Sequence, residues 1–379
     1  MAERRIGVIL NGATGRIGTT QHVRNLMAIR AEGGLALKGG DRLMPDLLLV
    51  GRDEAKLAAL AAANGGLRWS TDLSAALAGP DAIFMDCSAT GGRPELLRRA
   101  IAAGKHIHSE KPTAPTAAEA MAIARLAHAR GVRHGVIQDK LFLPGFAKLM
   151  GLKRSGFFGR IVGARIDAGS WIFDGELQAC QRPSWNYRKA DGGGLALDMM
   201  AHWRYMIDRL AAPVTRVAAQ ISTAMPHRID ERGVAYDVDV EDTVHALLTL
   251  EGGIPATISN SWATRVRRDD TMCVQIDGIG GSAVAGRQRC FIQPAAATPE
   301  AFGGAALGMD FGEHWVEVPD IGPSLPPFRQ CWELFLRHVT EDAPYLPTLV
   351  EGAKAVQLAE LVYRSHAEGR WVEAERLVL

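Results

Sequence analysis

The chain has 379 residues, which is long for a single hydrophobic core and predicts two domains. Hydrophobic residues make up 47% and charged residues 22%, as in an ordinary soluble globular protein. Because 43 Lys and Arg residues nearly balance 42 Asp and Glu residues, the charge gives no support for binding to nucleic acid or to an anionic membrane.

The first apolar run predicts a buried strand and not a targeting segment. Ile6 to Leu10 is too short for a secretion signal, and no run in the chain approaches the length of a membrane span. The five cysteines are scattered without a CxxC pair, which indicates reduced thiols and no bound metal. We therefore expect a cytoplasmic protein.

A glycine-rich loop follows this strand directly, and a helical apolar pattern follows the loop. Gly12 permits a tight turn, Gly15 lets backbone N–H groups approach a pyrophosphate, and Gly18 lets the helix pack close to the strand. An ordinary glycine turn is the alternative, but the strand–loop–helix context favours a dinucleotide site. The residues expected to bind the cofactor here are Gly12, Thr14, Gly15, Arg16, Ile17 and Gly18.

The second strand, expected at residues 46–50 after a polar excursion over residues 32–45, bears on the type of cofactor. An acidic residue near the end of this strand typically holds the ribose hydroxyls of NAD, whereas an arginine suits the 2′-phosphate of NADP. Arg52 favours NADP, and Asp53 keeps NAD open.

Helices and strands alternate through the rest of the first half. This alternation predicts a doubly wound parallel sheet with helices on both faces, an α/β fold over residues 1–140. The expected helices span residues 54–63, 94–103 and 116–130 with a short one from Leu73, and the strands lie near Trp69 and at residues 82–86, 105–108 and 133–138.

Polar residues at the carboxyl edge of this sheet are candidates for ligand binding. Ser88, Thr90 and the run Glu110-Lys111-Pro112 all follow expected strands. Pro112 biases Lys111 toward an extended conformation, which would hold its ammonium group at the edge, where it can hydrogen-bond a substrate hydroxyl. A Glu–Lys surface pair is the alternative.

The second half begins with a helix expected at residues 141–156 and a strand at residues 160–168. An irregular segment then combines aromatic rings with Arg and Asn donors, which suits a sugar or polyol as well as an ordinary packed loop. The candidate substrate-binding residues in it are Trp171, Trp185, Tyr187 and Arg188.

Three glycines at 192–194 then lead into an apolar helix that carries Asp198 and His202. The two residues are four positions apart and so share one face of the helix. We expect the glycines to let the wall of the substrate site approach the nicotinamide. Further strands are expected at residues 214–221, 243–250, 254–262 and 272–276, a long loop at 295–327, and helices at 328–339 and 349–366, the last packing back on the first domain.

Taken together, these motifs resemble the glucose–fructose oxidoreductase, inositol dehydrogenase and rhizopine catabolism family (Gfo/Idh/MocA). The matching pieces are the glycine loop, Ala103 through Pro112, Trp185 through His202, and Asp277 through Ser282. The resemblance implies an N-terminal Rossmann domain and a C-terminal α+β domain, here residues 141–379, with an open, mostly antiparallel sheet that supports homodimers or homotetramers. It also implies a catalytic set, which falls on Lys111, Asp198 and His202.

Two features depart from the family pattern. Ser88-Ala89-Thr90 and Arg93 stand where many members have Thr-Pro-Asn and a His, and the excursion over residues 32–45 is longer than expected.

The resemblance implies an NAD(P)-dependent oxidoreductase that moves a hydride between the nicotinamide and a secondary alcohol carbon of a sugar, polyol or glycoside. His202 would accept the hydroxyl proton, Lys111 would polarise the same oxygen, and Asp198 would orient His202 or bind a neighbouring hydroxyl. Two alternatives stay open: an NAD-dependent glycoside hydrolase that oxidises its substrate transiently, and a non-catalytic sensor of cofactor or sugar. The glycine loop alone also resembles dihydrodipicolinate reductases, to which Glu110-Lys111-Pro112 does not belong.

Overall fold

The computed structural model describes the chain except residues 1, 172–174, 180, 301–307, 321 and 323. The chain divides into two compact units. Unit 1 comprises Met1–Asp139, Leu325–Val356 and Leu377–Leu379, and unit 2 comprises Lys140–Ser324 and Gln357–Arg376. Residues 325–356, which the sequence analysis assigned to the second domain, group with unit 1 because helix α8 (Pro327–Glu341) packs against the helical segment that follows the glycine loop.

Unit 1 is built on a sheet in the order β2-β3-β1-β5-β6-β7, with β4 paired to β3. All its pairs are parallel except β2–β3. The strands are β1 (Glu3–Asn11), β2 (Leu35–Ala36), β3 (Arg42–Val50), β4 (Arg68–Ser70), β5 (Ile83–Asp86), β6 (His106–Ser109) and β7 (His134–Val136). The helices are η1 (Gly18–Val23), α1 (Arg24–Ala31), α2 (Glu54–Ala63), α3 (Leu73–Ala78), η2 (Thr90–Gly92), α4 (Arg93–Ala102), α5 (Ala117–Ala129), α8 and the start of α9 (Leu349–Glu368).

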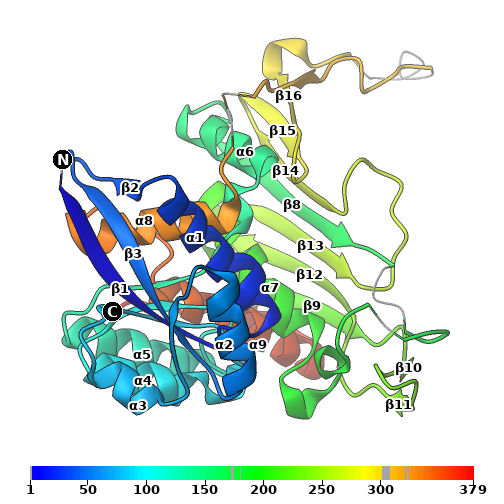
Figure 1. Ribbon diagram of the computed structural model, residues 1–379. Coiled ribbons are helices and arrows are strands. Elements are labelled where there is room, and N and C mark those ends of the chain that lie inside the picture. Colours follow the sequence, from blue (N-terminus) through cyan, green and yellow to red (C-terminus); the bar gives the residue numbers. More distant parts are fainter. Residues whose placement is uncertain (1, 172–174, 180, 301–307, 321, 323) are drawn as a thin grey trace. The chain divides into compact units, whose positions relative to one another are not determined.

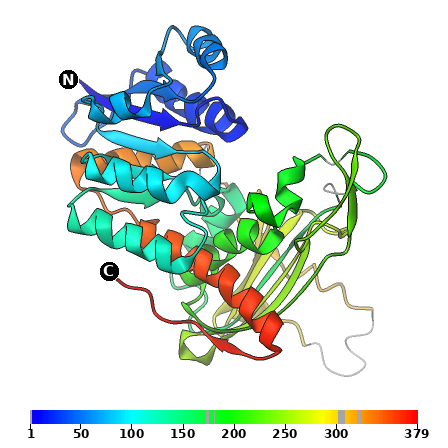
Figure 2. The ribbon, with the colours of Figure 1, turned by 90° about the horizontal axis from the view of Figure 1, so that it is seen from below.

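Helices cover both faces of this sheet (Figures 1 and 2). Ile9, Phe84 and Ile107 pack against α3, α4, α5 and the first turns of α9. Val8 and Leu10, which alternate with Ile9 along β1, are also fully buried. Strands buried on both faces explain the continuous apolar runs in the sequence and confirm the expected doubly wound sheet.

The excursion over residues 32–45 differs from the expected loop. β3 begins at Arg42, four positions before the expected strand, and pairs antiparallel with β2. The guanidinium of Arg42 donates to the carbonyls of Glu32, Gly33 and Gly34, which stabilises the turn after α1. These long-range hydrogen bonds leave no periodic pattern in the sequence.

Unit 2 is built on a nine-stranded sheet in the order β17-β16-β15-β14-β8-β13-β12-β9-β18. Only β8 and β13 pair in parallel, so the sheet is mostly antiparallel, as expected. Its strands are β8 (Ile161–Gly169), β9 (Val214–Ser222), β12 (Thr243–Leu250), β13 (Pro255–Ser261), β14 (Met272–Gly278), β15 (Gly281–Ala285), β16 (Cys290–Pro294), β17 (Val316–Glu317) and β18 (Val372–Glu373). The other elements are η3 (Lys140–Phe142), α6 (Pro144–Arg154), η4 (Ser184–Tyr187), η5 (Lys189–Asp191), α7 (Leu195–Leu210), η6 (Glu251–Gly253), η7 (Ala295–Ala297), the end of α9, and a hairpin of β10 (His227–Ile229) and β11 (Ala235–Asp237).

Helices α6, α7 and the end of α9 cover one face of this sheet, which we call the inner face (Figure 1). On β12, Val244 and Ala246 are buried with α7, whereas His245 and Leu247 alternate to the other, outer face and are exposed. Among the described residues, no helix is long and apolar enough to cross a membrane.

Candidate functional site

The glycine loop between β1 and η1 is shaped for close backbone approach. Gly12 has φ = 78°, and a Cβ built on it would lie 2.9 Å from the backbone nitrogen of Ser88. A Cβ on Gly18 would lie 2.6 Å from the carbonyl oxygen of Gly12, so this glycine lets the helix approach the loop. Helical backbone begins at Arg16, and the first N–H groups of a helix lack intrahelical partners. These free donors suit a pyrophosphate.

The end of β5 carries a buried ion pair that the sequence analysis did not assign to the site. Asp86 and Arg93 are almost completely buried, and Arg93 Nε lies 2.8 Å from Asp86 Oδ2. Asn11 Nδ2 and Ser88 Oγ donate to the other carboxylate oxygen, at 2.7 and 2.8 Å. Arg93 also donates to the carbonyls of Ser88 and Pro112. One arginine therefore ties the loop of Ser88 and Thr90 to the Glu110-Lys111-Pro112 loop.

Lys111 follows β6 at the carboxyl edge of the sheet, where the sequence predicted it. It is half-buried, the peptide bond to Pro112 is cis, and its backbone N–H donates to Glu110 Oε2 at 3.2 Å. Burial raises the pKa of Glu110, but a hydrogen bond from His22 and the charges of Lys111 and Arg93 outweigh it, so this pKa lies below its usual value. Lys111 thus stands beside a buried carboxylate.

Arg52 and Asp53, the residues expected to decide the type of cofactor, follow the end of β3. The Asp53 carboxylate caps α2 by accepting from the Lys56 backbone N–H at 3.0 Å, and this bond lowers its pKa. Arg52 is exposed, and no ion pair of its side chain is recorded among the described residues. The acid is therefore engaged in capping, and the arginine is available.

Gln138, just beyond β7, is a further polar residue at this edge. Its side chain is 1% exposed, and its Nε2 has no hydrogen-bond partner among the described residues. An ordered water or a ligand acceptor would satisfy a buried donor of this kind. The glycine loop fits the pyrophosphate of a dinucleotide, and Gln138 adds a donor at the same edge of the sheet. No cluster of three or more metal-ligating side chains occurs in the described part of the chain.

In unit 2, the glycine run before α7 serves the chain's own packing. Gly192 and Gly194 have φ of 78° and 112°, and a Cβ on Gly193 would lie 2.5 Å from the carbonyl oxygen of Asn186. The buried Glu241 caps α7, because its Oε1 accepts from the Ala196 N–H at 2.7 Å. Burial raises the pKa of this carboxyl. The glycines therefore let η4 and Glu241 approach the start of α7, and their expected approach to a nicotinamide stays a prediction.

Helix α7 presents Asp198 and His202 one turn apart. Its buried residues, including Met200 and Trp203, face the sheet, and Trp203 Nε1 donates to Asn260 Oδ1 on β13 at 2.6 Å. His202 is 4% exposed, whereas Asp198 is half-buried. Asp198 Oδ2 pairs with Arg182 Nη1 at 2.7 Å, and the Arg182 guanidinium lies 5.3 Å from the Trp262 ring centroid. The sequence placed Arg182 in the irregular segment without assigning it to the site.

The four predicted substrate-binding residues occupy different environments. Trp185 is 50% exposed, whereas Tyr187 is fully buried with Arg228 stacked 3.9 Å from its ring centroid. Arg265 lies 3.8 Å above the Trp171 ring, and Arg188 lies 4.6 Å from the Tyr236 ring. In this structure Arg228 covers the Tyr187 ring, so the ring is not open to the substrate contact expected of it.

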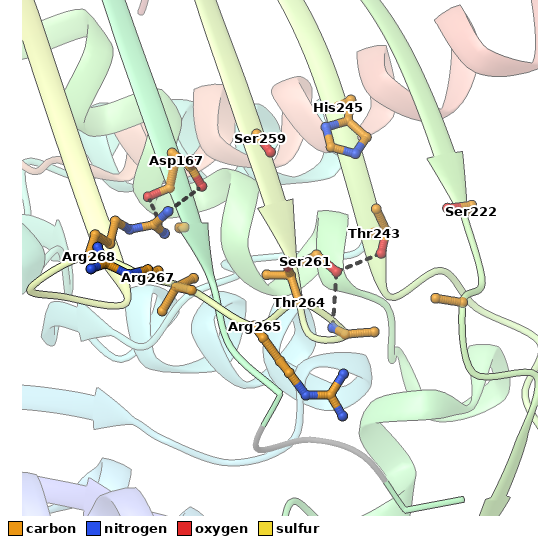
Figure 3. Close-up of a pocket in the computed structure, with 14 residues that line it drawn as sticks. Asp167, Ser222, Thr243, His245, Ser259, Ser261, Thr264, Arg265, Arg267 and Arg268 are labelled. Atoms are coloured by element: carbon orange, nitrogen blue, oxygen red, sulfur yellow. Dashed lines mark hydrogen bonds and ion pairs between the residues drawn. The ribbon is translucent and has the colours of Figure 1, made fainter.

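A cavity of about 470 Å³ lies on the outer face of the sheet, away from α7 (Figure 3). His245 and Ser259 line it from neighbouring strands, beside Asp167, Arg265 and Arg268. Because α7 packs on the opposite face, this cavity is separate from Asp198 and His202. His245 is thus an outer-face residue.

Lys111 belongs to unit 1, and Asp198 and His202 belong to unit 2. Each unit matches a family model. Residues 5–138 match the oxidoreductase family with an NAD-binding Rossmann fold, and residues 146–284 match the GFO/IDH/MocA C-terminal domain.

Similar proteins extend over almost the whole chain. A D-xylose dehydrogenase from Paenarthrobacter nicotinovorans is 42% identical, covering 99% of this chain and 98% of that protein. A levoglucosan dehydrogenase from Pseudarthrobacter phenanthrenivorans is 25% identical over 88% of this chain and 91% of that one. A solved structure of levoglucosan dehydrogenase in complex with NADH and levoglucosan superposes with a TM-score of 0.82 at 20% identity, covering 99% and 100% of the two chains. The chain belongs to the Gfo/Idh/MocA family of oxidoreductases.

Proposed function

We propose that the protein is an NAD(P)-dependent dehydrogenase that oxidises a secondary alcohol carbon of a sugar, with aldoses such as D-xylose as the first candidates. The observation that carries this proposal is the full-length 42% identity to a D-xylose dehydrogenase. The site residues are consistent with it, because a lysine stands at the carboxyl edge of a dinucleotide-binding sheet and an Asp–His pair stands on a substrate-domain helix.

Each candidate residue has a distinct role in the proposed reaction. The bound nicotinamide supplies the hydride acceptor. His202 accepts the proton of the reacting hydroxyl, since an imidazole has a pKa near working pH in its unperturbed state. Lys111 donates a hydrogen bond to the same oxygen and stabilises the negative charge that develops there. Asp198, held by Arg182, binds a neighbouring hydroxyl or orients His202.

For the cofactor, we propose a preference for NADP. Asp53 caps α2 with its carboxylate, whereas Arg52 is exposed and has a guanidinium that suits a 2′-phosphate. The ratio of kcat/KM for NADP⁺ and NAD⁺ tests this directly. Arg52→Ala should shift the ratio toward NAD⁺ by about tenfold, the size expected for one charge-assisted contact. An unchanged ratio would contradict the proposal.

A spectrophotometric screen tests the reaction itself. Aldoses, inositols and glycosides are each offered with NAD⁺ and with NADP⁺, and absorbance at the reduced-nicotinamide band reports turnover. Net formation of NAD(P)H with an aldose supports the dehydrogenase. Release of aglycone without net NAD(P)H would instead indicate the redox-neutral glycoside hydrolase, and cofactor binding without turnover would indicate a sensor.

We also propose that the outer face of the nine-stranded sheet mediates a homodimer or homotetramer. In its favour, this face is uncovered by helices and carries exposed Leu247 and Val162. Light scattering on a sizing column should give an oligomer for the wild type and a smaller species for Leu247→Glu. A monomeric wild type would refute this arrangement.

A further inference from the structure

A single π-helical turn after the glycine loop directs a histidine into the core of unit 1. In η1, the backbone N–H of Arg24 bonds to the carbonyl of Thr19, five residues back. Such turns are rare and frequently occur at functional sites. His22 at the end of this turn is fully buried, whereas Thr20 on the same turn is exposed.

His22 lies between two partners that come from distant parts of unit 1. Its Nδ1 accepts from Trp332 Nε1 of α8 at 3.1 Å, and its Nε2 lies 3.0 Å from Glu110 Oε1 after β6. Indole nitrogen is only a donor, so Nδ1 must be the unprotonated ring nitrogen. The ring is therefore the neutral Nε2–H tautomer, which donates to the Glu110 carboxylate.

Glu110 connects His22 to Lys111 through its two carboxylate oxygens. Its second carboxylate oxygen accepts the Lys111 backbone N–H at 3.2 Å, and its own N–H bonds to the Asp86 carbonyl at 2.9 Å. Glu110 is thus held at both carboxylate oxygens and at its backbone, immediately before the lysine that acts on the substrate oxygen.

A structural role alone is a poor account of this arrangement. A buried carboxylate loses hydration, and an apolar pair of similar volume would serve packing as well or better. The charged groups next to Glu110 are Lys111 and Arg93. The other titratable group near His22 is the buried His108, whose Nε2 bonds to the Tyr345 hydroxyl and whose pKa is lowered by burial. A buried acid kept ionised next to a reacting residue is typical of functional sites.

We propose that His22 is a positioning residue for the dehydrogenase reaction, holding Glu110 so that Glu110 fixes the backbone of Lys111. The inference rests on the proposed function, because it takes Lys111 as a catalytic residue. Trp332 sets the tautomer of His22. Helix α8, which lies more than 200 residues beyond Lys111 in the chain, therefore takes part in the arrangement.

Kinetics of His22→Phe and His22→Gln test the proposal. Phenylalanine keeps the ring volume without a donor, and we expect kcat to fall by about 10- to 100-fold, as for a small misplacement of a reacting group, with the Kd of coenzyme nearly unchanged. Glutamine retains an N–H donor, and it should recover most of kcat. The exposed Lys38→Ala serves as a control. A folded His22→Phe with kcat within about twofold of wild type, or equal losses in both variants, would overturn the proposal.

A second measurement is independent of turnover. In protein labelled with ¹⁵N-histidine, the His22 signals are identified by their loss in His22→Gln. We expect the signals of the neutral Nε2–H tautomer, because Nδ1 accepts from Trp332 Nε1. An Nδ1–H tautomer or an imidazolium signal would contradict this assignment. If Lys111→Ala keeps full activity, the proposed function of Lys111 fails, and the ¹⁵N spectrum still decides whether His22 is arranged as inferred.

Discussion

The candidate residues of the two units have different surroundings. In unit 1 the polar groups around Lys111 are buried and fixed by several partners, as Asp86 and Arg93 show with side-chain exposures of 0% and 3%. In unit 2 the Arg182–Asp198 pair is partly exposed, at 26% and 21%, and comes from an irregular segment. Buried networks that satisfy every group specify one arrangement, whereas half-exposed pairs on irregular backbone can adjust.

This difference matches the two ligands that the family's enzymes bind. A dinucleotide is the same molecule in every turnover, so a rigid edge suits it. Sugars differ by the orientation of single hydroxyls, and Arg182, which lies over the Trp262 ring and pairs with Asp198, supplies donors from an irregular segment. We infer that changes in the buried network of unit 1 act on catalysis and stability, and that changes in the irregular segment of unit 2 act on substrate choice.

The largest expected effect is at Lys111. Lys111→Ala should lower kcat by about a thousandfold, because it removes the donor to the developing alkoxide, while coenzyme still binds. His202→Ala should have a similar effect through loss of the proton acceptor. Steady-state kinetics and coenzyme titration measure both. Full activity of either variant would remove that residue from the mechanism.

The next largest effect is expected for Arg93→Met, which tests the buried ion pair of unit 1. This change leaves Asp86 buried without its cation, and the free energy of unfolding should fall by about 3–5 kcal/mol. Denaturant titration measures the loss. The matched control is Arg98→Met on the same helix, which removes an exposed pair with Glu119 and should change stability by less than about 1 kcal/mol. Similar losses of unfolding free energy in both variants would contradict the expected difference between buried and exposed ion pairs.

Acidification gives a smaller effect on unit 1. Burial and the nearby charge of His338 lower the pKa of His134 to about 4, so the folded state favours the neutral imidazole. The stabilisation is complete above the unfolded pKa of about 6.5 and is lost as pH falls toward 4, by on the order of 1–3 kcal/mol. His134 Nδ1 accepts from Leu349 N–H, which Asn can imitate. The free energy of unfolding of His134→Asn should therefore depend less on pH in this window than that of the wild type.

The smallest expected effect is at Arg182, in the irregular segment of unit 2. Arg182→Met should lower kcat/KM for the best sugar by about tenfold through loss of one charge-assisted partner of Asp198, with the KM of coenzyme unchanged. Arg165→Met, which removes the Asp277 pair on β8 and β14, is the control. A rise in the KM of coenzyme with unchanged sugar kinetics would contradict the inference that the irregular segment of unit 2 acts on substrate choice.

The sequence predicted the elements with strong local signals. The strand–glycine–helix start, the limits of α2 and β12, and the placement of Asp198 and His202 on one helix all follow from periodicity over short distances. The short strands β15, β16 and β18 were not predicted, because their pairing partners decide them and not their own residues.

The supporting residues of the site were beyond local reasoning. Arg93 had been noted only as a departure from the family pattern, and its burial depends on the carbonyls of Ser88 and Pro112. His22 had no role assigned, because its partner Trp332 lies 310 positions away. The local signal that could have identified Arg93 was a charged residue at the start of the helix that follows β5.

Helix α9 begins in unit 1 and ends in unit 2, and α8 before it belongs wholly to unit 1. During synthesis, the first 139 residues therefore leave the ribosome without Trp332, Phe335 and Leu349, which complete their core. Unit 1 can reach its final packing only after unit 2 has largely emerged. It is therefore an exception to the usual order, in which the N-terminal domain folds first. A fragment ending near residue 140 should consequently expose apolar surface and aggregate, even though it contains every residue of the glycine loop and Lys111.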